Sequence, residues 1–128
     1  MMPRLFKCTV LVTCALSISA CLPPTQFHWG SYEESLYARQ QHAGADGETD
    51  AATMLLATIN EAQSANKKAG PGIHADYGHL LLKQGRTDEA IAELQKEAAL
   101  YPESSLLMET IVARIQGRKG EQEKKLTP

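Results

Sequence analysis

The sequence predicts an all-α fold, and three observations support this prediction. Apolar residues recur at spacings of three and four along most of the chain, which is the period of one face of a helix. No stretch shows the sustained alternation of apolar and polar residues that marks a half-buried strand. Glycine and proline residues divide the second half of the chain into segments of helical length. We therefore expect helices joined by short turns.

The first expected helix runs from Ser31 toward Gln41. Ser31 and Glu34 have the spacing of a capping box, in which the hydroxyl accepts from the N3 amide and the carboxylate accepts from the N-cap amide. The preceding segment 22–26 contains two prolines and indicates an extended tether. The helix is thus predicted to begin at a capped serine after an extended segment.

The segment 42–49, HAGADGET, is expected to be a loop because of its composition. Its acidic residues alternate as in a calcium loop, but Ala51 stands where that loop needs glycine, so calcium is discounted. A second helix should start near Thr49 or Asp50 and stop before Gly70, which suits a left-handed cap and precedes a proline. One face of this helix is formed by Leu55, Ile59, Ala62 and Asn66.

Gly85 separates the next two expected helices. The third begins near Gly72, and the fourth begins at Thr87, where two following acidic residues favour the positive end of the helix dipole. The fourth helix ends before Pro102. The apolar stripe of the third helix is Ile73, Tyr77, Leu80 and Leu81. The stripe of the fourth is Ile91, Leu94, Ala98 and Tyr101.

Segment 71–104 matches a known repeat unit in length and in residue type. Two helices closed by a proline make a unit of about 34 residues, which is the tetratricopeptide period. Gly78 is small where the paired helices cross, Gly85 turns the chain, and Ala90 permits close approach. The other matching positions are Leu81, Leu94 and Pro102. The segment is therefore predicted to form a tetratricopeptide-like hairpin.

Two positions depart from the pattern of this repeat. His74 stands where an aromatic or apolar residue is usual, and Glu97 stands where alanine is usual. The Glu97 carboxylate either lies near the amides that begin the next helix or faces water. We expect it to face water, because carboxylates are seldom fully buried without a partner.

A single helix is expected after the repeat unit and should end near Gly117. Its apolar positions are Leu107, Met108, Ile111, Val112 and Ile115. The first two helices form a weaker hairpin of the same kind, so the predicted architecture is about two hairpins and a C-terminal capping helix. Repeat arrays ordinarily need at least three units. We therefore expect this short array to gain stability from a partner or from a second copy of itself.

The start of the chain has the three-part shape of a signal peptide. Basic residues come first, an apolar run follows at 8–19, and small residues precede Cys21. The run is too short for a transmembrane helix, which needs about 20 apolar residues. The sequence ISAC at 18–21 resembles a bacterial lipobox, whose cysteine is acylated and becomes the first residue after cleavage. Ile18 replaces the leucine that is usual at the first lipobox position.

Cysteine usage agrees with acylation of Cys21. Cys8 and Cys14 would leave with the signal peptide, and the one remaining cysteine cannot form an intramolecular disulfide. Several acyl chains hold a protein on a bilayer far better than one chain does. Leu22 stands where the bacterial inner-membrane retention signal would place aspartate, so we expect the periplasmic face of the outer membrane. The alternatives are a secretory signal cleaved elsewhere and an uncleaved anchor.

We divide the chain into a signal peptide at 1–20, the acylated cysteine and tether at 21–30, a helical domain at 31–117, and a charged tail at 118–128. The tail is expected to be disordered, and its interleaved acids and bases indicate a solvated end rather than a lipid-binding patch. The whole chain has a formal net charge of −2, and the basic tail leaves the helical domain more acidic still. This balance argues against nucleic acid as a partner, because nucleic acid binding needs a basic surface.

Residue types used in catalytic and metal sites are present but do not form a convincing site. His74 and His79 are five residues apart, which places them about 140° apart on a helix and prevents them from sharing a metal. His28 beside Trp29 favours an aromatic contact. Serines at helix starts are explained by capping. We expect no enzyme activity, no metal, and no cofactor other than the covalent lipid on Cys21.

Aromatic residues gather just after the expected tether. They are Trp29, Tyr32 and Tyr37, with Leu36 among them. One interpretation buries them against the first hairpin, because aromatic side chains dominate core energetics. The other makes Trp29 or Tyr37 a docking anchor, since aromatic residues are enriched among interface hot spots. Tyr77 has the same two interpretations, on the inner surface of the third helix or in the core.

Two stretches carry a resemblance to a known family. HWGSYEESLY at 28–37 is similar to the WGxYExxLY opening of a family of small bacterial lipoproteins, which is catalogued as a domain of unknown function. Segment 71–104 meets the second pattern of that family, PGxHAxxGxLLLxxGxxxEAIxxxxxExxxYPES. The resemblance implies an envelope lipoprotein with a tetratricopeptide-like fold. It also implies an accessory role beside a lipoprotein resembling the curli secretion channel subunit, and it brings no established enzymatic activity.

The sequence therefore supports the hypothesis of a lipid-anchored adaptor that binds another envelope protein, such as a curli-channel-like lipoprotein. We expect the inner faces of the first and third helices to offer a groove for a peptide or helix. The candidate partner-binding residues are Trp29, Tyr32, Tyr37, His74, Tyr77 and His79. Two alternatives stay open: a structural lipoprotein that associates with itself as a homo-oligomer, and a subunit of an envelope enzyme.

Overall fold

The computed structural model describes residues 26–126, so the expected signal peptide and Cys21 lie outside the described residues. The elements in chain order are β1 (Phe27–His28), α2 (Tyr32–Gln41), α3 (Ala45–Ser64), β2 (Lys68–Ala69), α4 (Ile73–Lys83), α5 (Thr87–Leu100), the 3₁₀ helix η1 (Pro102–Ser104) and α6 (Ser105–Leu126). The all-α class is confirmed.

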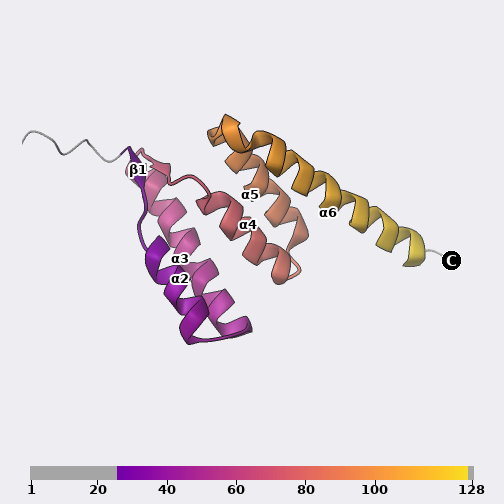
Figure 1. Cartoon of the computed structure of the whole chain (residues 1–128), viewed down its shortest axis with the longest axis horizontal. Helices are drawn as coiled ribbons and strands as arrows, with labels where there is room; N and C mark the ends of the chain where they lie inside the picture. Colours follow the sequence, from indigo (N-terminus) through magenta and orange to yellow (C-terminus); the bar gives the residue numbers. More distant parts are fainter. Residues whose placement is uncertain (1–25, 127–128) are drawn as a thin grey trace, which may run out of the picture.

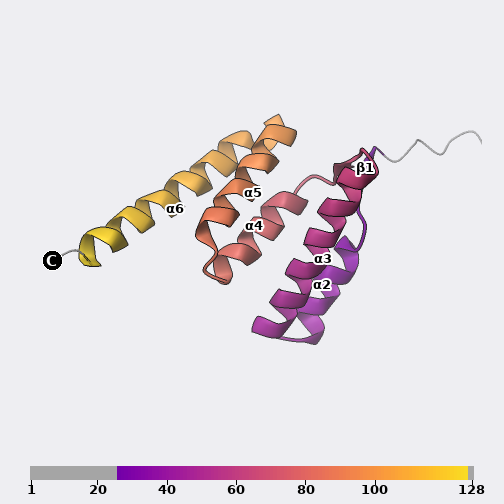
Figure 2. The same ribbon diagram turned by 180° about the vertical axis from the view of Figure 1, so that it is seen from behind.

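The helices stand side by side in chain order (Figure 1). α2 packs on α3, α3 on α4, α4 on α5, and α5 on α6. The first four helices make two tetratricopeptide-like hairpins, α2–α3 and α4–α5, and α6 follows as a single end helix. Seen from behind, β1 and the end of α6 lie at opposite ends of this row, and the last turns of α6 extend beyond α5 (Figure 2). The predicted architecture is therefore confirmed.

Two apolar clusters hold the helices together. The larger one joins α3, α4 and the start of α5, and its fully buried members include Leu55, Ile73, Leu80, Leu81 and Ala90. The smaller one joins α5 to α6 through Leu94, Met108 and Val112. Burial of each such leucine or isoleucine side chain stabilises the fold by about 1.5–3 kcal/mol. Gly78 lies at the α4–α5 crossing as predicted, because a Cβ there would approach the Ala90 carbonyl oxygen to 3.1 Å.

The second helix begins earlier than predicted, at Ala45 instead of near Thr49. Gly47 explains the difference, because it is buried and lies against the end of α2. A Cβ at Gly47 would lie 2.1 Å from the carbonyl oxygen of His42. The glycine therefore serves a close helix–helix approach, whereas its presence in the sequence indicated a loop.

The predicted capping box at Ser31 is wrong. The Ser31 side chain makes no capping hydrogen bond, and its backbone N–H donates to the Oγ1 atom of Thr58, 3.1 Å away on α3. Glu34 is exposed. A tertiary acceptor from the neighbouring helix therefore takes the place of the local carboxylate.

Part of the expected tether is ordered by a contact that the sequence analysis did not foresee. β1 and β2 form a two-stranded parallel pair in which Phe27 lies opposite Lys68 and His28 opposite Ala69. Gly70 does not adopt the predicted left-handed conformation, which is found instead at Asn66 (φ 51°) after α3. The Trp29 ring covers Gly70, where a Cβ would lie 2.6 Å from the ring.

Two further predictions are corrected at the second hairpin and the end helix. Glu97 does not face water, since it is 2% exposed and accepts a hydrogen bond of 2.7 Å from the N–H of Gly72. Its negative charge therefore stabilises the positive end of the α4 dipole.

α6 does not end near Gly117 but continues to Leu126, so most of the tail predicted to be disordered is helical. A glycine inside a helix costs only about 1 kcal/mol relative to alanine, and the residues around Gly117 favour helix.

Candidate protein-binding surfaces

The structure buries two of the sequence-predicted binding residues. His74 is 4% and Tyr77 is 5% exposed, and both belong to the interior face of α4. Tyr77 packs in the larger apolar cluster. Neither side chain offers surface to a partner in this conformation, so both serve the packing of the second hairpin.

His74 takes part in a polar contact between α4 and α5. Its Nδ1 atom lies 2.7 Å from Oε2 of Glu93, and Oε1 of Glu93 accepts from Lys96 at 2.7 Å. Burial acts to raise the pKa of the Glu93 carboxyl, but the hydrogen bonds of His74 and Lys96 outweigh it and hold that pKa below its ordinary value. Among the described residues, no group of three or more histidine, cysteine or acidic side chains could hold a metal ion.

The aromatic residues near the start of the domain are more exposed than the burial interpretation requires. Trp29 is 46% and Tyr37 is 54% exposed, Leu36 is also exposed, and Tyr32 is half-buried. The Trp29 and Tyr32 rings are in contact, with centroids 5.7 Å apart. Tyr37 instead borders a shallow depression between α2 and α3 that also contacts His42 and Met54. The structure therefore does not join Trp29 and Tyr37 in one site.

The inner helices α2 and α4 are joined by an ion pair. Arg39 and Asp76 form a two-pronged contact, with Nη1 of Arg39 3.0 Å from Oδ1 of Asp76 and Nη2 paired with Oδ2. This hydrogen bond raises the pKa of Arg39. The groove expected between the first and third helices thus contains this ion pair, and an open hollow lies further along the chain.

This hollow, here called the α4–α6 trough, lies between the second inner helix and the end helix. It has a volume of about 380 Å³ and is lined by His79, Leu82, Lys83, Ile111, Arg114, Ile115 and Arg118. A second hollow of about 490 Å³ continues it and shares three of these residues, adding Thr87 and Lys119. His79 is the one residue of the trough that the sequence analysis named as a binding candidate.

The trough has an apolar floor and a basic rim. Leu82, Ile111 and Ile115 form the floor and are only half-buried. The basic residues around them are His79, Lys83, Arg114 and Arg118, and no acidic residue is among the described residues that line it.

The arginines of the rim are the least compensated charges of the trough. Lys83 pairs with Glu48, and Lys119 at the far edge lies 2.8 Å from Asp88. Arg114 and Arg118 have no ion-pair partner within the described part of the chain. The trough is therefore a basic, partly apolar surface on a protein of net charge −2.

The sequence analysis missed Arg114 and Arg118 because they stand at the end of the last expected helix. A usable signal was present, since each of Ile111 and Ile115 precedes an arginine, Arg114 and Arg118, by three residues, and the two pairs are four residues apart. Such spacing places all four on one side of a helix. The analysis assigned the isoleucines to the core and Arg118 to a solvated tail.

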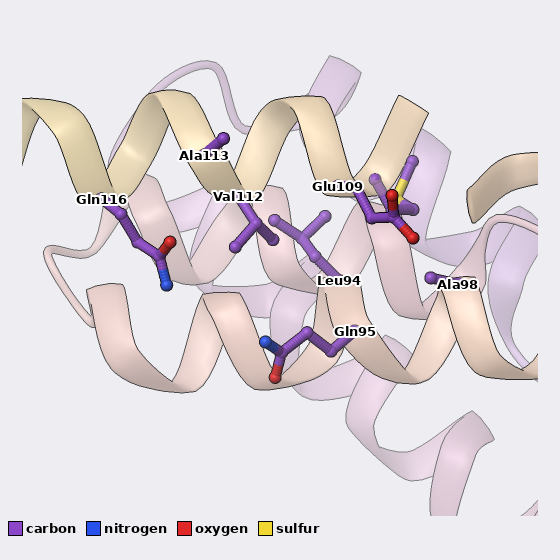
Figure 3. Close-up of a pocket in the computed structure, with 8 residues that line it drawn as sticks. Leu94, Gln95, Ala98, Glu109, Val112, Ala113 and Gln116 are labelled. Atoms are coloured by element: carbon purple, nitrogen blue, oxygen red, sulfur yellow. The ribbon is translucent and has the colours of Figure 1, made fainter. Parts of the chain in front are cut away.

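A smaller pocket lies on the other side of α6, against α5. Leu94 of α5 and Val112 of α6 point toward one another there, with Gln95 and Gln116 nearby (Figure 3). Its volume is about 150 Å³. Glu109 is the single charged residue among those described as lining it, so it lacks the charge pattern of the trough.

None of the helices in the described range 26–126 is both long enough and apolar enough to cross a membrane. The fold and its open surfaces define a small helical-repeat protein that presents hollows between neighbouring helices. The chain belongs to the family described as a domain of unknown function (DUF4810), whose model matches residues 26–111. No curated protein and no solved structure matches the chain.

Proposed function

We propose that this protein is a lipid-anchored lipoprotein of the bacterial outer membrane, facing the periplasm, and that it acts as an adaptor that binds another envelope protein. The observation that carries the adaptor role is the α4–α6 trough. Its half-exposed floor of Leu82, Ile111 and Ile115 is the kind of surface that a helix or peptide covers on binding. No catalytic role is part of this proposal.

The anchor belongs to the proposal because of the lipobox-like ISAC at 18–21. An acyl group on Cys21 would be separated from β1 by the short segment 22–26. That segment spans at most about 3.6 Å per residue, so β1 would be held close to the bilayer. Since α6 lies at the other end of the row of helices (Figure 1), the trough would face away from the membrane and toward periplasmic partners.

Tethering supplies the mechanism of the adaptor. Confining two proteins to one membrane surface raises their effective concentration for each other, so a modest groove is sufficient for stable association. The family motifs at 28–37 and 71–104 lead us to include a curli-channel-like lipoprotein among the partners. An accessory role in secretion or assembly follows from that choice.

Self-association is the second candidate, and exposed leucines favour it. Leu106 is 78% exposed at the start of α6, and Leu36 is exposed on α2 at the other end of the array. Apolar side chains at both ends of a stacked array would suit contact between copies. A homo-oligomer built this way would leave the trough free.

In vivo photo-crosslinking of the full chain tests the adaptor role. A photo-crosslinking amino acid replaces Ile115 in the trough, or Leu107, which stands one turn before Ile111 of the trough on α6. A matched protein carries it at Gln63, an exposed position of α3. We expect an adduct with one envelope protein from the trough positions and none from Gln63. Cys21→Ser should weaken the adduct and abolish labelling by a clickable fatty acid.

Two results would contradict the proposal. Equal adducts at trough and control positions would show that the trough has no specific partner. An adduct with the mass of two copies of this chain would favour self-association.

A further inference from the structure

We infer that the partner segment bound by the α4–α6 trough is an acidic amphipathic helix. This inference rests on the adaptor role proposed above and adds the chemistry of the partner. It comes from the combination of an apolar floor with a rim that carries one sign of charge.

The floor and the exposed stripe that continues it along α6 have the dimensions of a short helix interface. Ile111 and Ile115 of the floor are four residues apart, and Leu107, four residues before Ile111 and outside the trough, is 59% exposed. At a rise of 1.5 Å per residue, this stripe is about 12 Å long. A helix that lies along it would contribute apolar residues at positions i, i+3 or i+4, and i+7.

The rim selects the charge of the occupant. Arg114 and Arg118 are four residues apart and lie on the same flank of α6, opposite His79 and Lys83 of α4. A guanidinium group binds a carboxylate through two parallel hydrogen bonds, and arginine is enriched at interface hot spots. An occupant with carboxylates on both edges of its apolar stripe would therefore meet basic groups on both walls.

The acidic residues that are described beside the basic groups of the trough leave that role open. Glu48 pairs with Lys83 and Asp88 with Lys119, so both are placed beside lysines. Neither approaches Arg114 or Arg118 closely enough for an ion pair. These two arginines are the charges that a partner would engage first.

A protein helix fits this surface better than a lipid bilayer does. The basic groups surround a hollow between two helices, whereas a planar anionic membrane is contacted best by a flat or convex basic face. One wall of the trough is formed by α6, which lies at the opposite end of the row of helices from β1 (Figure 1). The bilayer that would hold the chain is therefore on the other side of the domain.

Charge variants of the full chain test the inference in envelopes through the adduct at Leu107. The double variant Arg114→Glu/Arg118→Glu should reduce the adduct about tenfold or more, because repulsion replaces two attractive contacts. Arg114→Lys/Arg118→Lys should keep most of it. Lys67→Glu/Lys68→Glu, the matched change at exposed positions outside the trough, should leave it unchanged. Circular dichroism of each variant verifies that the fold is intact.

Peptides provide a second readout with detergent-solubilised full chain. A labelled helical peptide with leucines at i, i+3, i+4 and i+7 and glutamates elsewhere should bind at least about tenfold more tightly than its lysine counterpart by fluorescence anisotropy. Arg114→Glu/Arg118→Glu should reverse this preference. The acidic peptide should also bind more weakly as salt is raised.

The outcomes separate this inference from the adaptor role. An adduct that survives the charge reversal unchanged, or peptides that bind equally well, would overturn the acidic partner and leave the adaptor standing. Absence of any adduct in the unmodified chain would overturn both. Loss of binding to vesicles of anionic lipid in the charge-reversed variant, with the adduct unchanged, would assign the rim to a membrane and also overturn the inference.

Discussion

The two helical hairpins share an architecture but are stabilised in different ways. In the second hairpin, α4 buries six side chains or glycines, including Ile73, Tyr77 and Leu81. In the first, α2 buries only Ser35 and Ala38 and leaves Leu36 and Tyr37 exposed. The buried apolar residues of the first hairpin lie instead on α3, among them Leu55 and Ile59. The comparison teaches that the strong repeat signature marks the hairpin whose inner helix is buried.

The largest expected effect is the removal of a core leucine from the second hairpin. Leu81→Ala should lower the free energy of unfolding by about 2–5 kcal/mol, because it deletes a fully buried side chain and leaves a cavity. The matched change in the first hairpin, Leu36→Ala, should stay within about 0.5 kcal/mol because Leu36 is exposed. Urea unfolding monitored by circular dichroism measures both. Equal losses from the two variants would contradict the contrast between the hairpins.

Removal of the buried carboxylate of the second hairpin should have the next largest effect. Glu97→Ala should cost about 1–3 kcal/mol, since the N–H of Gly72 loses its acceptor at the start of α4. Glu103→Ala, at an exposed acidic position of η1, is the control and should change stability little. Thermal unfolding of the two variants measures the change in stability that each substitution causes. An unchanged stability in Glu97→Ala would show that water replaces the carboxylate at no cost.

The same contrast explains which parts of the fold could be predicted from the sequence. The second hairpin was predictable because its determinants are local: Gly78 at the crossing, Gly85 at the turn, and apolar residues at helical spacing. The start of the first hairpin was not, because the acceptor for Ser31 is Thr58, which is distant in the sequence. Gly47 indicated a loop and proved to be a helix contact, which only the packing of α2 on α3 reveals.

The candidate site was predictable only in part, and for a related reason. The trough joins residues of α4 and α6, whose closeness depends on how α6 packs on α5. His79 was named from the sequence, although its environment was unknown. Arg118 required the knowledge that α6 continues past Gly117 as a helix, and Arg114 required the position of α6 beside α4. For Trp29 and Tyr37 the sequence allowed both burial in the first hairpin and a role as docking anchor, and the structure leaves both exposed.

An ion pair between Arg39 of α2 and Asp76 of α4 joins the two hairpins. We expect it to contribute less to the free energy of unfolding than Leu81 or Glu97 does. The side chain of Arg39 is 26% exposed and that of Asp76 is 21% exposed. Solvent therefore weakens the attraction between them. Arg39→Ala and Asp76→Ala should each destabilise the protein by about 1 kcal/mol. Their effects should not be additive, with a coupling of about 0.5 kcal/mol or more in a double-mutant cycle. Additive effects would show that the ion pair does not hold α2 to α4.

The smallest expected effect is the pH dependence contributed by Glu93 of the second hairpin. Its pKa is lower in the folded protein than the ordinary value of 4.5, so the folded state binds the proton less readily than the unfolded state does. The carboxylate therefore adds stability above pH 4.5, and this contribution is lost as the pH falls through the lowered folded pKa. The difference in unfolding free energy between the unmodified protein and Glu93→Gln should accordingly shrink on acidification.

Urea titrations of both proteins at a series of pH values measure this difference, and Glu109→Gln, at an exposed acidic position of α6, is the matched control. A difference that stays constant through this range would place the stabilising role of Glu93 in packing instead of in its contacts with His74 and Lys96.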